Sequence, residues 1–299
     1  MNGLVLVDKA AGGTSHDVVN RWRKLAGTRR VGHLGTLDPM ATGLLALLTG
    51  ASTRLAPFYE RAEKTYQAVI RFGVISDTYD AEGVVTETGV PLPAADAVRD
   101  ALAEFHGKLA QKPPPVSAKK IAGVPAYKLV RRKVPVDLRP VEIEIKALAI
   151  KAVSGDEVEV EVTCSAGTYI RSLAHDLGQK LGCGALLRRL RRTKVGEFLI
   201  SEARTLEQLA ALAEEGRLAE AVVPAGQLLA HLPAESVSAT VEAQIRQGRQ
   251  FRTSPFVIPP GSPLVRVLSR SGELIAIGKM IIPNLYHPST VFQVEGAGA

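Results

Sequence analysis

Two neighbouring segments of the chain alternate between polar and apolar residues, EIEIKAL at 142–148 and VEVEVTCS at 158–165. Such alternation places the apolar side chains on one face of a β-strand. Gly155-Asp156 lies between the two segments and favours a tight turn. These residues predict an antiparallel hairpin with one face in solvent. The fold must therefore contain an antiparallel sheet.

Helical periodicity appears between the capping residues Thr14 or Ser15 and the stop signal Gly27. The apolar side chains of this segment share one face: Val18, Val19, Trp22 and Leu25. Pro39 at a first-turn position predicts a second helix over 39–48. Further helices are expected at 94–106, at 169–181 and from Thr205, and further strands at 3–7 and 64–74. This mixture predicts an α/β (α+β) fold.

From residue 248 onward, short apolar runs alternate with Gly and Pro. The runs include FVIPPG, LVRVLSRSGELIAIGK and TVFQV. This pattern predicts a small all-β module of roughly sixty residues, near the lower limit for independent folding.

The charge balance indicates an anionic partner. The chain of 299 residues has 37 Lys and Arg against 30 Asp and Glu, a net charge of +7 and a pI near 9.5. Nucleic acid is the commonest partner of such a protein, although the same charge also fits a protein that simply stays in solution.

The sequence carries no targeting or membrane signal. Its N-terminus lacks a basic region, and Asp8 interrupts the first apolar run. The densest apolar run, at 44–48, is too short to span a bilayer. Cys164 and Cys183 lie nineteen positions apart without a CxxC pair, which favours a reduced, cytoplasmic setting over a disulfide or zinc site.

One acid stands alone in a basic segment. Asp38, within GHLGTLDPMATG at 32–43, is the only carboxylate between Asp17 and Glu60. Asp followed by Pro is a common helix N-cap, so a structural role is one interpretation. The alternative is a carboxylate, kept ionised by cations, that attacks an electrophilic carbon or stabilises an oxocarbenium-like centre.

A second basic cluster, RRLRRTK at 188–194, holds five cationic side chains in seven positions. It predicts a patch that follows a phosphate backbone, with a solvated charge run as the alternative.

Several motifs together resemble the TruB family, whose members make pseudouridine in the T-loop of tRNA. GHLGTLDPMATGLL at 32–45 resembles the catalytic motif of that family. Other blocks match in the same order: LVLVDKAAGGTSHDVV at 4–19, KTYQA at 64–68, DTYDAEG at 77–83, PPPVSAKKIAGVPAYKLVRR at 113–132 and CSAGTYIRSLAHDLGQKLGCGALLRRLRRTKVGEF at 164–198. Ala10 departs from the pattern, because the family commonly has proline there.

The resemblance implies a two-part architecture. Residues 1–232 would form a pseudouridine-synthase domain with a mixed, largely antiparallel sheet and a thumb-like insertion at about 108–140. Residues 236–299 would form a small PUA-like, all-β RNA-binding module.

The same resemblance assigns roles to single residues. Asp38 would be the nucleophile, Arg171 would pair with it and keep it ionised, and Asp80 would extend the ion-pair network. Tyr66 would stack on the flipped uracil. The remaining substrate contacts would be His33 against the T-loop bases, Tyr169 and Leu190 lining the uracil pocket, and Lys9 supporting the site. Contacts to the RNA backbone are expected from Arg29, Arg30, Lys119, Arg188, Arg189, Arg191 and Arg192.

The reaction implied is isomerisation of the T-loop uridine at position 55 of tRNA, by base flipping, cleavage of the glycosidic bond and reattachment through C5. It would need no metal and no cofactor. The enzyme would act as a monomer in the cytoplasm, without a guide RNA or a protein partner. A non-catalytic RNA chaperone and a guide-dependent synthase are the alternatives, and acylal and glycal routes both remain open.

Overall fold

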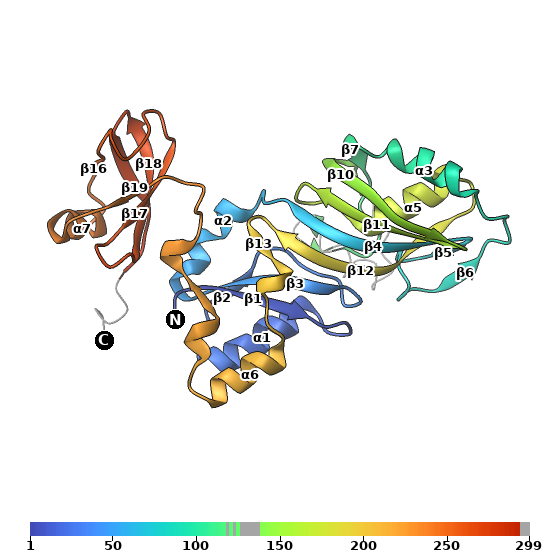
Figure 1. The fold of residues 1–299 in the computed structure, drawn as a ribbon, viewed down its shortest axis with the longest axis horizontal. Helices are drawn as coiled ribbons and strands as arrows, with labels where there is room; N and C mark the ends of the chain where they lie inside the picture. The colour runs from blue at the N-terminus through green and yellow to red at the C-terminus, as the bar shows by residue number, and fades with distance from the viewer. Residues whose placement is uncertain (118–119, 122–123, 126–137, 294–299) are drawn as a thin grey trace.

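The computed structural model describes residues 1–117, 120–121, 124–125 and 138–293. Two bodies of secondary structure follow one another along its long axis: a large sheet with its helices, and a small sheet formed by the C-terminal residues (Figure 1). The expected mixed class of sheets and helices is therefore confirmed.

Within the described ranges, the large sheet has ten strands, eight of which follow the order β14-β1-β3-β12-β4-β11-β10-β7. All paired neighbours are antiparallel except β3 and β12, which run parallel over two residue pairs. The predicted, largely antiparallel sheet is confirmed. Its strands are β1 (Gly3–Lys9), β2 (Val31–His33), β3 (Thr42–Thr49), β4 (Lys64–Phe72), β7 (Gly107–Gln111), β10 (Val141–Ser154), β11 (Glu157–Cys164), β12 (Ala185–Val195), β13 (Phe198–Leu199) and β14 (Val222–Pro224).

The hairpin predicted from alternation is confirmed as β10 and β11. The chain reverses at 155–156, where Gly155 has a φ of 58°. Val158, Val160 and Val162 are fully buried, whereas the glutamates between them keep contact with solvent. One face of this hairpin therefore contributes to the core and the other stays wet.

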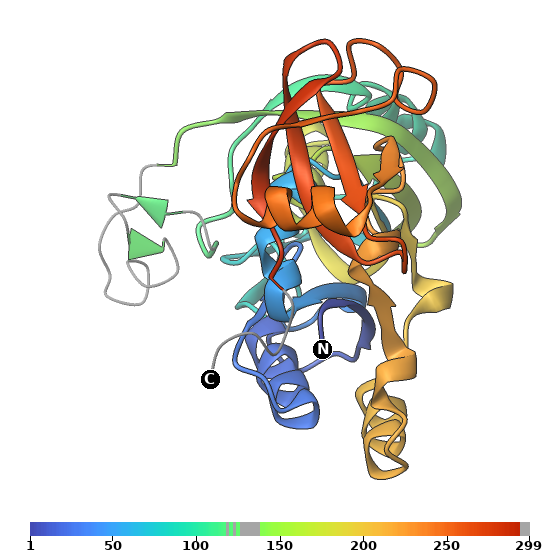
Figure 2. The ribbon, with the colours of Figure 1, turned by 90° about the vertical axis from the view of Figure 1, so that its left-hand side faces the viewer.

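Four helices share a single hydrophobic core with the large sheet. α1 contacts α6 beneath β1 and β3, and α3 contacts α5 at the other end of the sheet (Figures 1 and 2). Trp22 of α1 and Leu173 of α5 are both buried in this core. The helices are α1 (Ser15–Ala26), α3 (Ala95–Ala103), α5 (Ile170–Lys180) and α6 (Leu206–Glu214).

The helix ends follow the signals seen in the sequence. Thr14 caps α1 by accepting a hydrogen bond from the Asp17 backbone N–H, and Gly27 ends the helix with a φ of 61°. Thr205 and Gln208 form a reciprocal capping box at the start of α6. These predictions are confirmed.

The helix predicted over 39–48 is wrong, because most of this segment is the central strand β3. Leu45 and Leu47 point into the core shared with the helices, whereas Leu44 and Leu48 point into a second cluster on the opposite face. A strand buried on both faces reads as a continuous apolar run without alternation. Gly43 has a φ of 100°, and a side chain there would lie 2.3 Å from the Arg192 carbonyl oxygen. Asp38 therefore caps no helix.

The C-terminal module is a five-stranded sheet in the order β15-β17-β18-β19-β16. It has its own core, which includes Phe251, Val265 and Tyr286. One helix, α7 (Ala239–Arg246), accompanies the predicted strands, and the module is consistent with a PUA-like region. The strands are β15 (Ala234–Ser236), β16 (Phe251–Arg252), β17 (Leu264–Leu268), β18 (Leu274–Ile282) and β19 (Leu285–Val291).

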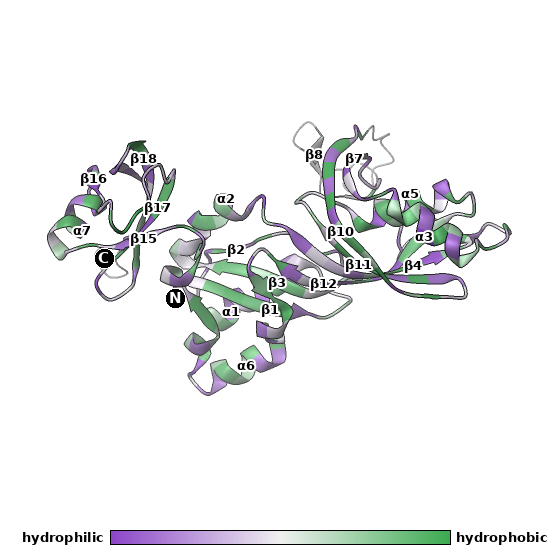
Figure 3. Cartoon of the chain, turned by 45° about the horizontal axis from the view of Figure 1, so that its top comes forward, coloured by the Kyte–Doolittle hydropathy of each residue, from purple (hydrophilic) through white to green (hydrophobic). Residues whose placement is uncertain are grey.

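A second hydrophobic cluster joins this module to the large sheet. Leu274 and Ile277 of β18 belong to the same buried cluster as Leu4 of β1 and Leu44 of β3. Figure 3 shows β1 and β3 largely in the apolar colour, as expected of strands that contribute to both clusters. Arg266 of β17 also bonds the chain that precedes the module, donating to the carbonyl oxygens of Gly226 at 3.1 Å, Leu228 at 3.3 Å and Leu232 at 3.1 Å.

Short elements complete the description. Tyr59 ends a short helix, α2 (Ala56–Tyr59), which follows the 3-10 turn at Gly50–Leu55. Three more 3-10 turns lie at Ile200–Glu202, Leu218–Ala221 and Ala225–Gln227, and two small hairpins at β5 (Val74–Ser76) with β6 (Val85–Glu87) and β8 (Lys120–Ile121) with β9 (Val124–Pro125).

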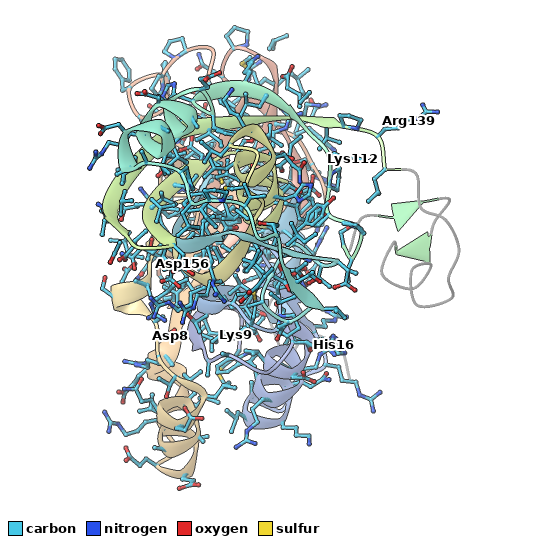
Figure 4. All side chains as sticks on the ribbon, turned by 90° about the vertical axis from the view of Figure 1, so that its right-hand side faces the viewer. Asp8, Lys9, His16, Lys112, Arg139 and Asp156 are labelled. Carbon is cyan, nitrogen blue, oxygen red and sulfur yellow. The ribbon has the colours of Figure 1, made fainter. Side chains whose placement is uncertain are left out.

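The insertion expected at about 108–140 stays a prediction, because residues 118–119, 122–123 and 126–137 lie outside the described residues. Residues 107–111 form β7, and Gln111 pairs with Val141 of β10, so the chain leaves and rejoins the large sheet at neighbouring positions. Figure 4 labels Lys112 and Arg139, which flank this excursion. Lys119, predicted to contact RNA, lies outside the described residues.

Both cysteines are free and buried. No helix among the described residues is long and apolar enough to cross a membrane.

Candidate active site

The central feature of the site is an ion pair between residues 133 positions apart. Asp38 lies in the loop between β2 and β3, and Arg171 lies in the first turn of α5. Arg171 Nε is 2.9 Å from Asp38 Oδ2, and Arg171 Nη2 donates to Asp38 Oδ1 at 3.0 Å. The guanidinium side chain is 5% exposed and the carboxylate side chain 33% exposed. Arg171 therefore orients the Asp38 carboxylate from the protein interior, and the carboxylate stays partly open to solvent.

The other edge of the same guanidinium faces the loop 77–83. Arg171 Nη1 donates to the Thr78 carbonyl oxygen at 3.1 Å and lies 3.4 Å from Asp80 Oδ2. Asp80 is itself buried, and its Oδ1 accepts from Thr78 Oγ1 at 2.6 Å and from the Glu82 N–H at 3.0 Å. One guanidinium therefore serves two carboxylates and one carbonyl, which fixes its plane.

Asp38 and Arg171 line a cleft of about 510 Å³. Four other residues predicted to contact substrate line the same cleft: His33, Tyr66, Tyr169 and Leu190. They come from the end of β2, from β4, from the start of α5 and from β12. The structure thus brings together segments that are far apart in the sequence.

Alternation along β4 and β12 determines which of their side chains form one wall of the cleft. Lys64 and Tyr66 share one face of β4, Leu190 and Arg192 share one face of β12, and Tyr66 pairs directly with Arg192. Burial raises the pKa of the Tyr66 phenol, although the charge of Arg192 opposes that shift. Burial lowers the pKa of Lys64, and Arg192 lowers it further. This wall combines an aromatic ring with two buried cations.

Two buried cations hold the backbone of the Asp38 loop from opposite sides. Lys9 Nζ donates to the carbonyl oxygens of Pro39 and Ala41 at 3.1 and 2.7 Å, and to that of Ala10 at 2.9 Å. Arg192 donates to the carbonyl oxygens on the other side, those of Gly35 at 2.9 Å, Thr36 at 3.2 Å and Leu44 at 2.8 Å. The loop therefore keeps a fixed shape without a helix.

The chain is similar to known proteins over nearly its whole length. A model of the TruB family pseudouridylate synthase (N terminal domain) matches residues 23–170, and a model of the tRNA pseudouridylate synthase B C-terminal domain matches residues 171–230. A tRNA pseudouridine synthase B of Solibacter usitatus is 49% identical over 97% of this chain and 100% of its own length. One of Geotalea uraniireducens is 41% identical over 95% and 93%.

The chain belongs to the TruB family.

Solved structures share the fold. The structure of an H/ACA RNP bound to a substrate RNA containing 2'-deoxyuridine has a chain that matches with a TM-score of 0.73 and 24% identity, over 98% of this chain and 86% of that one. The crystal structure of the archaeal box H/ACA sRNP Nop10-Cbf5 complex gives a TM-score of 0.71 and 24% identity, over 98% and 86%. The TruB-family sheet therefore persists at low sequence identity.

Two residues of the TruB-family site do not lie where the sequence predicted. Lys9 is 1% exposed and is not among the residues that line the cleft, so it supports the Asp38 loop from behind. Arg192 was expected in an exposed phosphate-binding patch, but it is also 1% exposed and donates to three backbone carbonyls. That expectation is wrong for Arg192, because alternation along β12 turns its side chain inward.

Two other arginines of the basic patch form ion pairs within the protein. Arg191 bonds both carboxylate oxygens of Asp8, at 2.7 and 3.0 Å, and Arg188 pairs with Glu157. The other described cations predicted to contact RNA are exposed and form no ion pair with a described residue: Arg29, Arg30 and Arg189. Their contact with RNA stays a prediction.

Sequence reasoning missed two residues of the site. Lys64 could have been found, because it lies two positions before Tyr66 on a predicted strand and must share its face. Gln111 gave no signal: it is buried, and its amide donates to the Tyr169 carbonyl at 3.0 Å and accepts from the Tyr169 N–H at 2.8 Å. Gln111 thereby fixes the backbone beside Arg171.

The His33 ring accepts a hydrogen bond from the Gly35 N–H at Nδ1, at 3.3 Å. Burial lowers its pKa, and the charge of Arg192 acts in the same direction. Both effects favour a neutral ring at the cleft wall. Among the described residues, no group of three or more His, Cys, Asp or Glu side chains could hold a metal ion.

Replacing Lys9 by methionine should destabilise the protein by about 2–4 kcal/mol, because three backbone carbonyls around its buried ammonium lose a charged donor. Methionine carries no charge, so folding no longer pays the cost of desolvating an ammonium, and this offsets part of the loss. Chemical denaturation measures the effect. Lys180→Met is the matched control, since Lys180 forms an exposed ion pair with Glu104 whose loss should cost less than about 1 kcal/mol. Equal effects of the two replacements would contradict the role given to Lys9.

Proposed function

We propose that this protein is a stand-alone tRNA pseudouridine synthase that isomerises the uridine at position 55 in the T-loop. Membership of the TruB family and the curated relatives named tRNA pseudouridine synthase B support pseudouridine formation in tRNA. The observation that carries the finer proposal is the Asp38 carboxylate, held by buried Arg171 at an open cleft beside Tyr66. Since tRNA is its substrate, the proposal places the enzyme in the cytoplasm.

Reaching the uridine requires that the base leave its stack. Flipping a nucleotide costs a few kcal/mol. Stacking on aromatic side chains returns roughly 1–3 kcal/mol per base, which suits Tyr66 for the flipped uracil and His33 for the bases left behind. Tyr169 and Leu190 line the same cleft and would enclose the uracil.

The chemistry then breaks the bond between C1′ and N1 and forms a bond between C1′ and C5. Asp38 would either attack C1′ or remove the proton at C2′, and both routes need an ionised carboxylate in the cleft. After the uracil turns, C5 joins C1′, which releases the Asp38 carboxylate in the first route and returns the proton from Asp38 to C2′ in the second. The C5 proton then leaves, and N1 carries a proton in the product. The cleft walls keep the free uracil from escaping between these steps.

Arg171 would orient Asp38 throughout, and Asp80 would orient Arg171. Their contacts support these positioning roles, because the guanidinium has an acceptor on each edge. Lys9 and Arg192 would keep the Asp38 backbone still while the RNA binds.

The direct test uses the purified chain alone on unmodified tRNA, with tritium release from uracil labelled at C5 as the readout. Release that reaches one equivalent per tRNA, and is lost when uridine 55 is replaced by cytidine, is expected. A strict requirement for a guide RNA or a second protein would favour the guide-dependent alternative. Release from the cytidine variant would overturn the choice of position.

Affinity for tRNA should fall steeply with salt, by about 30- to 100-fold between 50 and 200 mM, if three or four phosphates are neutralised. Replacing Arg29, Arg30 or Arg189 by glutamine should each reduce the slope of log Kd against log salt by about one. Filter binding measures the slope. Arg99→Gln is the control, because exposed Arg99 pairs with Asp96 on α3 and should leave the slope unchanged. A flat salt response would contradict the predicted phosphate contacts.

A further inference from the structure

Tyr79 has a backbone conformation that its side chain disfavours. Its φ is 65°, in the left-handed region that suits glycine, and an aromatic residue there needs its surroundings to hold it. It lies in the middle of the loop 77–83, between Thr78 and Asp80, which both contact Arg171. The strained residue thus lies within the network that orients Asp38.

The Tyr79 ring stacks on His175 of α5. The ring centroids are 3.8 Å apart and the planes differ by 4°. Within the described ranges, neither the Tyr79 hydroxyl nor the His175 imidazole makes a hydrogen bond, so stacking is their specific contact. Burial lowers the pKa of His175, which favours the neutral ring.

His175 and Arg171 are four positions apart on α5 and therefore share one face of that helix. The loop 77–83 touches this face at two points one turn apart: Thr78 and Asp80 on Arg171, and Tyr79 on His175. Its backbone is fixed from another side by β12, since Leu187 donates to the Tyr79 carbonyl at 3.0 Å.

The ion pair alone holds this loop weakly. Asp80 approaches Arg171 at 3.4 Å, whereas its shorter bonds, to Thr78 and Glu82, lie within the loop. The direction of the Asp80 carboxylate therefore follows the position of the loop.

We propose that the Tyr79–His175 stack is a positioning pair for the reaction: it fixes the loop 77–83 against α5 so that Asp80 and Thr78 keep Arg171 aimed at Asp38. This inference rests on the proposed function of Asp38. It concerns the rate of the chemical step, because neither ring lines the cleft.

The test measures single-turnover rates and tRNA Kd for four variants. Tyr79→Asn removes the ring but tolerates the left-handed backbone, and His175→Ala removes the partner ring. Both should lower the rate by about tenfold, because small misplacements near the chemistry are costly, and should leave Kd within about twofold. Tyr79→Phe and His175→Phe keep two stacked rings and should stay within about twofold of wild type.

Double variants show whether the two rings act through one contact that positions Arg171 or through a general loss of structure. The double variant Tyr79→Asn with His175→Ala should be no slower than either single variant, since both remove one contact. In an Asp80→Asn background, His175→Ala should have little further effect on the rate. His106→Ala, which removes an exposed histidine far from the cleft, serves as control.

The possible results support or overturn the positioning role of the stack. Wild-type rates in Tyr79→Asn and His175→Ala would overturn the proposal, as would an equal loss in Tyr79→Phe. A fall in melting temperature in these variants with an unchanged rate would show a purely structural contact and would also overturn it. Full activity of Asp38→Asn would instead remove the proposed function on which the inference rests.

Discussion

Asp38→Asn should reduce pseudouridine formation by at least about 1,000-fold while tRNA still binds. The amide has nearly the same shape as the carboxylate, but it can neither attack C1′ nor accept the C2′ proton. Affinity should hold or rise slightly, because the replacement removes a negative charge near the RNA and keeps the shape of the cleft. Tritium release under single-turnover conditions gives the rate, and filter binding gives Kd.

Asp96→Asn is the matched control for this prediction, since Asp96 is an exposed acid on α3. It should retain the wild-type rate. If Asp38→Asn stayed within about tenfold of wild type, the protein would use this surface to bind or refold RNA, and the catalytic assignment would be lost.

Replacing Arg171 by methionine should cost both activity and stability. Asp80 is buried and would lose its cation, and breaking a buried ion pair from one side typically destabilises a protein by about 3–5 kcal/mol. Asp38 would lose its orienting donor, so the reaction rate should fall by about 100-fold or more. Arg171→Lys should fall between, because an ammonium cannot reach both carboxylates and the Thr78 carbonyl with a rigid fork.

A second replacement tells the two losses apart. Adding Asp80→Asn to Arg171→Met removes the stranded charge and should restore much of the stability, measured by urea unfolding, without restoring activity. Recovery of activity together with stability would mean that Arg171 acts only through the fold.

Local sequence patterns predicted the outer sheet better than its centre. The glutamates between Val158, Val160 and Val162 marked one wet face, so β10 and β11 could be recognised from alternation alone. β3 offered no such contrast, since Leu44 and Leu48 face one cluster and Leu45 and Leu47 the other. A strand with two dry faces and a buried helix leave the same apolar run in the sequence.

The site depended on the family resemblance rather than on local chemistry. Asp38 alone favoured a helix cap, and nothing near Arg171 in the sequence indicated its partner. The inward turn of Arg192 was missed because RRLRRTK looks uniformly basic until a strand separates its two faces. Gln111 could not have been recognised, since its partner is a backbone that only the folded chain brings near.

The hydrophobic cluster shared by the C-terminal module and the large sheet has a consequence for the cooperativity of unfolding. Leu274 and Ile277 are buried in one cluster with Leu4 and Leu44, and Arg266 of β17 donates to the Leu228 and Leu232 carbonyl oxygens at 3.3 and 3.1 Å. Cutting the linker near residue 233 should therefore leave the two fragments associated, and the chain should melt in one calorimetric transition. The module and the large sheet should therefore unfold as one cooperative unit, although each has a hydrophobic core of its own.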